Sequence, residues 1–246
     1  MRGISAWCCL LSLTLTAGLA SAEPRRASSG LERRSLLELY TSEGCSSCPP
    51  TDAWLRARAP QLARAKIIPI ALHVDYWNEI GWVDPFSQPR FSARQRAAAG
   101  RAGSGSVYTP ELMLNGREIS RHAVENEATS APITNARITV ETSERGPSSL
   151  QVSVRAVDAG GAPQVYLAIC ESGLSVAVRS GENAGRTLEH DFVVRELIGP
   201  ISGTSLDREL TLPAGWNRAH LTLVGFVENA RSGEVLQAVE LPLSPR

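Results

Sequence analysis

The stretch LLELYTSEGCSSCPP, residues 36–50, decides how this chain is interpreted. It starts with an apolar run typical of a β-strand, and a helical pattern follows it. Between the two lie Cys45 and Cys48, two residues apart. A CxxC pair between a strand and a helix is the basic unit of thiol–disulfide chemistry. We therefore expect Cys45 to be the catalytic nucleophile and Cys48 to resolve the resulting mixed disulfide.

Other interpretations of this pair stay open. It could be a structural disulfide or an inert remnant. Zinc is disfavoured because it takes four ligands, and the sequence has no second CxxC and no close pair of histidines. Copper(I) fits better, since soft thiolates select it, and Cys45, Cys48 and His73 could supply three ligands. Our leading expectation is no metal and no cofactor.

The first 22 residues have the pattern of an export signal. Arg2 precedes an apolar stretch at 4–19, and Ala20-Ser21-Ala22 forms a small-residue cleavage site. The apolar run is short for a membrane span, which needs about 20 residues, and a retained anchor is the alternative. We expect a periplasmic or secreted mature protein without a membrane span. Its CxxC would then work where disulfides form and persist.

The bulk composition is that of an ordinary globular protein. The 246 residues are 43% hydrophobic and 20% charged, and their formal net charge is zero. Arginine supplies nearly all the basic charge, and the arginines are scattered along the chain. Nucleic-acid binding needs them clustered on one face, so we expect no nucleic-acid partner.

The first half of the mature chain alternates strand and helix patterns. Residues 23–34 are polar and rich in arginine, which predicts a disordered leader. The run at 67–77 is apolar on both alternating faces, as in a strand in the middle of a parallel sheet covered by helices. The elements expected up to residue 128 are strands at 36–40 and 67–77, helices at 51–65 and 89–99, a hairpin at 111–120 that turns at Asn115-Gly116, and a short helix at 122–128.

The pattern changes after Pro132. Evenly spaced strand-like segments separated by turns predict an all-β sandwich. They lie at 137–142, 150–157, 164–171, 174–178, 206–212, 220–227 and 235–241. We expect a domain boundary near 130–134, which separates an α/β domain at 35–131 from a β-sandwich domain at 132–246.

The order of elements resembles the thioredoxin fold. A strand, a CxxC, a helix and a second strand are followed by Thr109-Pro110 at the start of the hairpin. The resemblance implies an α/β thioredoxin-like domain in which Pro110 is a cis-proline beside the CxxC. It also implies that Tyr108, Thr109 and Pro110 bind extended substrate. An ordinary trans proline at a strand start is the alternative.

Longer segments are similar to a family of secreted bacterial proteins with a thioredoxin-like domain and no known function. The segments that carry the resemblance are 38–50, 73–77, 82–86, 108–110 and 181–188. It implies a fold and a location, but no substrate.

Activation of Cys45 depends on where the first helix begins. A helix N-terminus stabilises a nearby thiolate. Because a residue before a proline avoids helical backbone angles, we expect the regular helix to begin only near Pro50. Cys45 would then lie on the approach turn and be less activated.

His73, Asp75 and Trp77 alternate at the end of the second strand, where sites of open α/β sheets lie. His73 or Asp75 could manage protons beside the CxxC, although we favour a role in organising the next loop through hydrogen bonds. The aromatic loop at 77–90 could form binding surface or cap the core.

Two features of the second half need interpretation. Cys170 lies in an apolar segment and is expected to pack as a small buried hydrophobe, rather than relay electrons to Cys45. The loop at 181–188, which includes Arg186, could face the CxxC, but we favour a simple connector between strands.

The leading hypothesis is an exported thiol–disulfide oxidoreductase that acts through Cys45 and Cys48 on protein disulfides. Its partners would be protein thiols or disulfides and an unidentified redox protein. The alternative is a non-catalytic thioredoxin-fold binding module for copper(I) or a protein partner.

Overall fold

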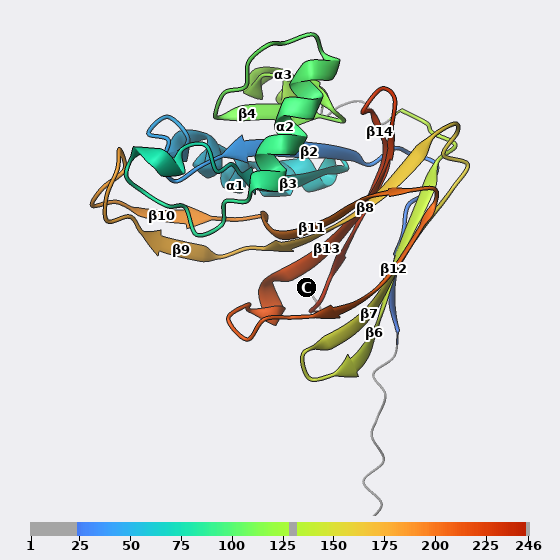
Figure 1. Ribbon diagram of the computed structural model, residues 1–246. Helices are drawn as coiled ribbons and strands as arrows, with labels where there is room; N and C mark the ends of the chain where they lie inside the picture. The colour runs from blue at the N-terminus through green and yellow to red at the C-terminus, as the bar shows by residue number, and fades with distance from the viewer. Residues whose placement is uncertain (1–23, 128–131, 245–246) are drawn as a thin grey trace, which may run out of the picture.

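A computed structural model describes residues 24–127 and 132–244 of the chain (Figure 1). The expected export signal at 1–22 and part of the expected domain boundary, residues 128–131, lie outside the described residues.

The main feature is an eight-stranded mixed sheet. Its strand order is β14 (Val235–Pro242), β13 (Leu221–Asn229), β8 (Pro163–Glu171), β11 (Val193–Ser202), β3 (Ile67–His73), β2 (Ser35–Thr41), β4 (Glu111–Leu114) and β5 (Arg117–Glu118). β3 runs parallel to both β2 and β11, and the other pairs are antiparallel. The prediction of a central strand among parallel neighbours is therefore confirmed for β3.

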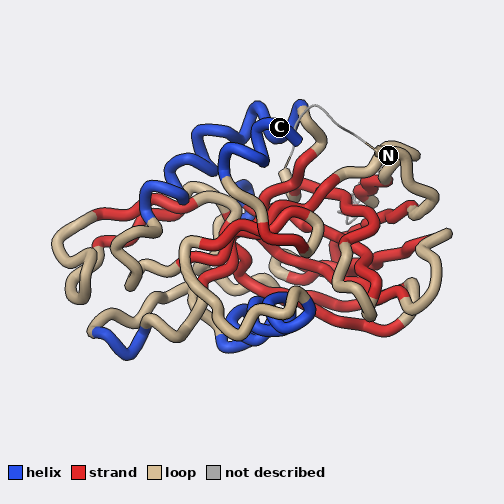
Figure 2. The backbone as a smooth tube through the Cα atoms, turned by 90° about the horizontal axis from the view of Figure 1, so that it is seen from above, coloured by secondary structure: helices blue, strands red, loops and turns tan. Residues whose placement is uncertain are grey.

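Helices cover both faces of the N-terminal part of this sheet (Figure 2). They are α1 (Pro49–Arg64), α2 (Pro89–Arg101) and α3 (Arg121–Glu127). Side chains of β2 alternate between two cores: Leu36 packs with Phe91 of α2, and Leu37 packs with Leu55 of α1. This alternation explains why the strand is apolar at almost every position.

A second sheet packs on the C-terminal part of the large sheet (Figure 1). Its strands are β1 (Arg25–Ser28), β6 (Arg137–Gly146), β7 (Ser149–Val157) and β12 (Ser205–Thr211). Gly225 of β13 marks where the two sheets approach closely. A Cβ atom there would lie 2.4 Å from Cγ2 of Val140, so no larger residue fits without a shift.

A two-stranded hairpin and two short helices complete the described structure. The hairpin consists of β9 (Leu174–Ala177) and β10 (Thr187–His190), which pair antiparallel. The single-turn 3₁₀ helices are η1 (Asn78–Ile80) and η2 (Arg218–His220).

The predicted fold class, an α/β thioredoxin-like domain followed by a separate sandwich, is wrong. The described chain is mostly β-sheet, and the large sheet continues without a break from the expected first domain into the second. β11 makes this connection, because Val193 pairs with Ala71 of β3 while the strand also pairs with β8. Its pattern was missed because Gly199-Pro200 and two register shifts interrupt the strand.

The predicted disordered leader at 23–34 is also wrong for the residues that form a strand. Residues 25–28 form β1, and Ala27 packs against the core between the sheets. β6 supplies the hydrogen-bonding partner that this polar segment lacks by itself. A polar strand that forms by pairing with a neighbour cannot be predicted from hydrophobic periodicity.

Candidate functional site

Cys45 and Cys48 form a disulfide in the loop between β2 and α1. Their Cα atoms are 5.5 Å apart, and neither residue is exposed. Ser46 and Ser47, by contrast, face solvent. Both cysteines are therefore buried, whereas the two serines between them are exposed at the surface.

The first helix begins one residue earlier than expected. Pro49 is its first residue, and Cys48 is the N-cap with helical backbone angles of φ −75° and ψ −44°. Proline fits the first helical position because that N–H has no partner within the helix. The disulfide thus lies directly at the N-terminus of a 16-residue helix, where the positive end of the dipole stabilises a thiolate.

The Thr109–Pro110 peptide bond is cis, as the resemblance implied. The carbonyl oxygen of Thr109 lies 3.8 Å from Sγ of Cys45, and the hydroxyl of Ser47 is 3.5 Å from the same oxygen. Tyr108 beside it is half exposed, and its hydroxyl donates a hydrogen bond to Glu118, which raises the Tyr108 pKa to about 12. The structure therefore brings the expected substrate-binding segment against the CxxC.

The expected alternation of His73, Asp75 and Trp77 is wrong, because β3 ends at His73. The three side chains then diverge. His73 pairs with Asp84, Asp75 accepts a hydrogen bond from Ser92 of α2, and Trp77 donates one of 2.7 Å to Oγ1 of Thr109. Of the three, Trp77 is the one that supports the loop beside the disulfide.

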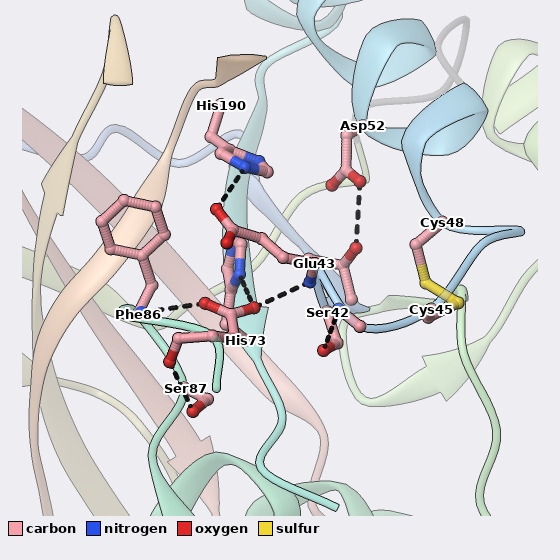
Figure 3. Close-up of polar contacts among 12 residues, drawn as sticks. Ser42, Glu43, Cys45, Cys48, Asp52, His73, Phe86, Ser87 and His190 are labelled. Atoms are coloured by element: carbon pink, nitrogen blue, oxygen red, sulfur yellow. Dashed lines mark hydrogen bonds and ion pairs between the residues drawn. A yellow bond between two sulfur atoms is a disulfide. The ribbon is translucent and has the colours of Figure 1, made fainter. Parts of the chain in front are cut away.

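A buried polar cluster lies behind the disulfide (Figure 3). Glu43, two residues before Cys45, contacts His190 of β10 at 3.0 Å and accepts a 2.7 Å hydrogen bond from Trp82. Asp84 lies 2.7 Å from His73 and accepts the N–H of Glu43 at 2.8 Å. The hydrogen bonds and ion pairs of Glu43 and Asp84 therefore stabilise the loop that carries Cys45 on its buried side.

Aromatic rings close this cluster. The rings of His73, Phe86 and His190 pack edge to face with each other, at centroid distances of 5.0–5.7 Å. Phe86 is buried, so it caps the core as the second interpretation of the aromatic loop proposed. Val83 and Ile80 of the same loop remain exposed.

The electrostatics of the cluster are set by burial and mutual charge. Burial alone would lower the pKa of His73, but the charge of Asp84 and its hydrogen bond outweigh burial and raise it. Burial would raise the pKa of Asp84, and His73 outweighs that effect and lowers it. Burial raises the pKa of Asp52, which accepts a hydrogen bond from Thr41. Nε2 of His73 and Nδ1 of His190 have no hydrogen-bond partner among the described residues.

The residues described here do not assemble the copper site of the alternative interpretation. Within residues 24–127 and 132–244, no group of three or more His, Cys, Asp or Glu side chains is arranged to hold a metal ion. Cys45 and Cys48 are bonded to each other, and Nδ1 of His73 is directed to Asp84.

The loop at 181–188 is not a simple connector. It joins β9 to β10 and reaches the CxxC from the far half of the sequence. The side-chain amide of Asn183 donates to the carbonyl oxygens of Glu43 and Cys45, at 2.8 and 3.0 Å. Glu182 accepts the backbone N–H of Ser46 at 3.0 Å. Arg186 does not touch the cysteines, and donates instead to Oδ1 of Asn183 at 2.7 Å.

Sequence reasoning missed six residues of this site: Glu43, Asp52, Asp84, Glu182, Asn183 and His190. They share no motif spacing. Glu182, Asn183 and His190 contact the CxxC loop from more than a hundred positions away in the chain, whereas Asp52 and Asp84 contact Thr41 and His73, which are closer in sequence. The one available signal was that Glu43, Asp84 and the loop at 181–188 fall in the segments that carried the family resemblance.

Cys170 packs as predicted. It is a buried free cysteine in the core shared by β8 and α2, and burial raises the pKa of its thiol far above the usual range. A buried neutral thiol of this kind is inert.

Comparisons with known proteins give a fold but no activity. A crystallised protein from Agrobacterium tumefaciens is 22% identical with a TM-score of 0.60, and the match covers 89% of this chain and 98% of that chain. A domain of an outer membrane lipoprotein from Porphyromonas gingivalis is 15% identical with a TM-score of 0.30, over 48% of this chain and 94% of that domain. No curated protein matches.

Among the described residues, no helix has the length and apolar character needed to cross a membrane. The model of one family, described as a protein of unknown function (DUF1223), matches residues 36–228. This match spans the CxxC, the Thr109–Pro110 segment and the β9–β10 hairpin. The chain therefore belongs to the DUF1223 family.

Proposed function

We propose that this protein is an exported thiol–disulfide oxidoreductase that acts on protein disulfides through Cys45 and Cys48. One observation carries the proposal: the Cys45–Cys48 disulfide lies at the N-terminus of α1 with Sγ of Cys45 against the carbonyl oxygen of Thr109. A helix N-terminus favours a thiolate, and a backbone segment beside the sulfur offers hydrogen bonds to an extended client.

The proposed exchange conserves atoms and electrons. In the reduced protein the Cys45 thiolate attacks one sulfur of a client disulfide, a bond forms between them, and the second client sulfur leaves as a thiolate. The Cys48 thiolate then attacks Sγ of Cys45, which restores the Cys45–Cys48 disulfide and releases the first client sulfur. Two electrons pass to the client, and the reverse sequence oxidises a client dithiol.

Export is part of the proposal. It rests on the pattern of the first 22 residues, with an apolar stretch followed by Ala20-Ser21-Ala22. An oxidising compartment is where the disulfide form of the CxxC persists. Detection of a mature protein that begins after Ala22 in a periplasmic or culture fraction tests this part, and full-length protein in the cytoplasm would contradict it.

The burial of both sulfurs favours a second function, a non-catalytic binding module. Cys45 and Cys48 are 0% exposed, whereas a nucleophile must be reached by its client. Under this alternative the disulfide only stabilises the loop, and a protein partner binds the exposed face around Ser46 and Tyr108.

Trapping separates the two functions. In a Cys170→Ala background, Cys48→Ala should accumulate mixed disulfides between Cys45 and substrate proteins that contain disulfides, because no Cys48 thiolate is present to release the client. The double variant Cys45→Ala/Cys48→Ala is the control and should trap none. The oxidoreductase proposal fails if Cys48→Ala captures no client and the wild-type protein neither reduces nor oxidises a model disulfide.

A further inference from the structure

The β9–β10 hairpin reaches the CxxC through contacts that the proposed chemistry does not yet use. Ser180 donates a 2.5 Å hydrogen bond to the carbonyl oxygen of Gly81, and Gly181 lies directly against Trp82. On the other side of the loop, Glu189 forms a 3.0 Å ion pair with Arg56 of α1. The hairpin is thus held at Gly81 and at α1, and between these two contacts Glu182 and Asn183 meet the CxxC loop.

Asn183 holds the backbone that carries Cys45. It is 1% exposed, and Nδ2 donates to the carbonyls of both Glu43 and Cys45. Its Oδ1 accepts from Arg186, so the orientation of the amide is set on both sides. A buried carbonyl that loses its donor is costly, which makes this amide a fixed support for the loop.

Glu182 places a negative charge at the peptide group that follows Cys45. Hydrogen bonds from the side chain and backbone of Ser46 lower the pKa of Glu182, so the carboxylate is ionised. The carboxylate also occupies the peptide N–H that directly follows Cys45. A thiolate on Cys45 would meet this like charge, whereas the neutral disulfide does not.

We infer that Glu182 and Asn183 are positioning residues of the Cys45–Cys48 site, contributed by the β9–β10 hairpin: Asn183 fixes the Cys45 backbone, and Glu182 disfavours the Cys45 thiolate. This inference rests on the proposed thiol–disulfide chemistry of the site. The hairpin then biases the pair toward the disulfide form and restricts the approach of other thiols to Cys45.

The effect of the Glu182 charge is tested by the equilibrium of the Cys45–Cys48 pair with glutathione. Glu182→Gln should shift the equilibrium toward the dithiol form about threefold, since one nearby unit charge in water is removed. It should also lower the Cys45 pKa, measured as the pH profile of alkylation by iodoacetamide. Glu189→Gln removes the same charge from the same hairpin at the Arg56 contact and should change neither quantity. Equal values for Glu182→Gln and wild type would overturn the inference about Glu182.

The positioning role of Asn183 is tested by the rate at which dithiothreitol reduces the Cys45–Cys48 disulfide. Asn183→Asp keeps the shape and the acceptor for Arg186 but cannot donate to the two carbonyls, so reduction should accelerate about tenfold. Ser180→Ala removes one hydrogen bond of the hairpin outside the CxxC loop and should accelerate reduction much less than Asn183→Asp does. An unchanged rate in Asn183→Asp, or equal acceleration in Ser180→Ala, would overturn the inference about Asn183.

These measurements need no client protein. Glu182 is exposed, so its variant is expected to fold even where Asn183→Asp does not. A shift in Glu182→Gln without client capture would reject the oxidoreductase proposal and retain the positioning role. Client capture by Cys48→Ala without any shift in Glu182→Gln would retain the oxidoreductase proposal and reject the positioning role of Glu182.

Discussion

The indole Nε1 of Trp77 donates a 2.7 Å hydrogen bond to Oγ1 of Thr109. The carbonyl oxygen of the same threonine lies 3.8 Å from Sγ of Cys45. Trp77 also packs against the CxxC loop, since a Cβ on Gly44 would lie 3.0 Å from Cβ of Trp77. One tryptophan therefore contacts both the Thr109–Pro110 segment and the loop that carries the disulfide.

Replacing the acceptor should weaken this arrangement. Thr109→Val keeps the side-chain shape but leaves Trp77 without its hydrogen bond, so the free energy of unfolding should fall by about 1–2 kcal/mol. Urea denaturation measures the change. Thr109→Ser retains the hydroxyl and should stay close to wild type. The role of the hydrogen bond is refuted if the two variants are equally stable.

The His73–Asp84 pair should make stability fall on both sides of a pH plateau. The pKa of His73 is raised above 6.5, so its contribution is fully present below that pH and is lost as the pH rises through the folded-state pKa. The pKa of Asp84 is lowered below 3.8, so its contribution is present above that pH and is lost as the pH falls through the folded-state pKa.

Asp84→Asn removes this charge pair. The difference in unfolding free energy between wild type and Asp84→Asn, measured in urea from pH 3 to 9, should be largest between the two transitions and shrink on both sides. A difference that does not vary with pH would show that the pair contributes no linked protonation.

Arg94 of α2 joins strands from distant parts of the sheet. It contacts Glu38 of β2 at 2.6 Å and Glu228 of β13 at 2.9 Å, and all three side chains are at most 9% exposed. Arg94→Met leaves both carboxylates without this partner and should cost about 3–5 kcal/mol. Arg96→Met on the same helix removes a cation–π contact with Tyr76 and should cost below about 1 kcal/mol. Equal costs would contradict the bridging role.

Cys170 should stay unmodified in the folded protein. Its thiol is buried and its pKa is raised, so iodoacetamide should label it only after unfolding. Peptide mapping by mass spectrometry measures the labelled fraction. Rapid labelling of Cys170 under native conditions would reopen the electron relay to Cys45.

Local patterns predicted the elements that carry the candidate site. The strand before Cys45, the helices over 49–64 and 89–101 and the hairpin at Asn115-Gly116 all follow from periodicity and turn chemistry. β11 was not predicted because Gly199-Pro200 breaks its strand pattern, and β1 was not predicted because its sequence is polar. Missing β11 led directly to the wrong fold class, since it is the strand that joins the two halves of the sheet.

The residue order alone shows a CxxC at a strand–helix junction and a third cysteine in an apolar segment, and the family resemblance adds a Thr-Pro step beside the CxxC. The fold adds that one sheet unites both halves, that the sulfurs are covered, and that Asn183 and Glu182 meet the CxxC loop. This division follows from distance along the chain. Hydrophobic periodicity involves about ten neighbouring residues, whereas the pairing of β11 with β3 and the contacts of Asn183 and Glu182 join residues more than a hundred positions apart, which no local pattern records.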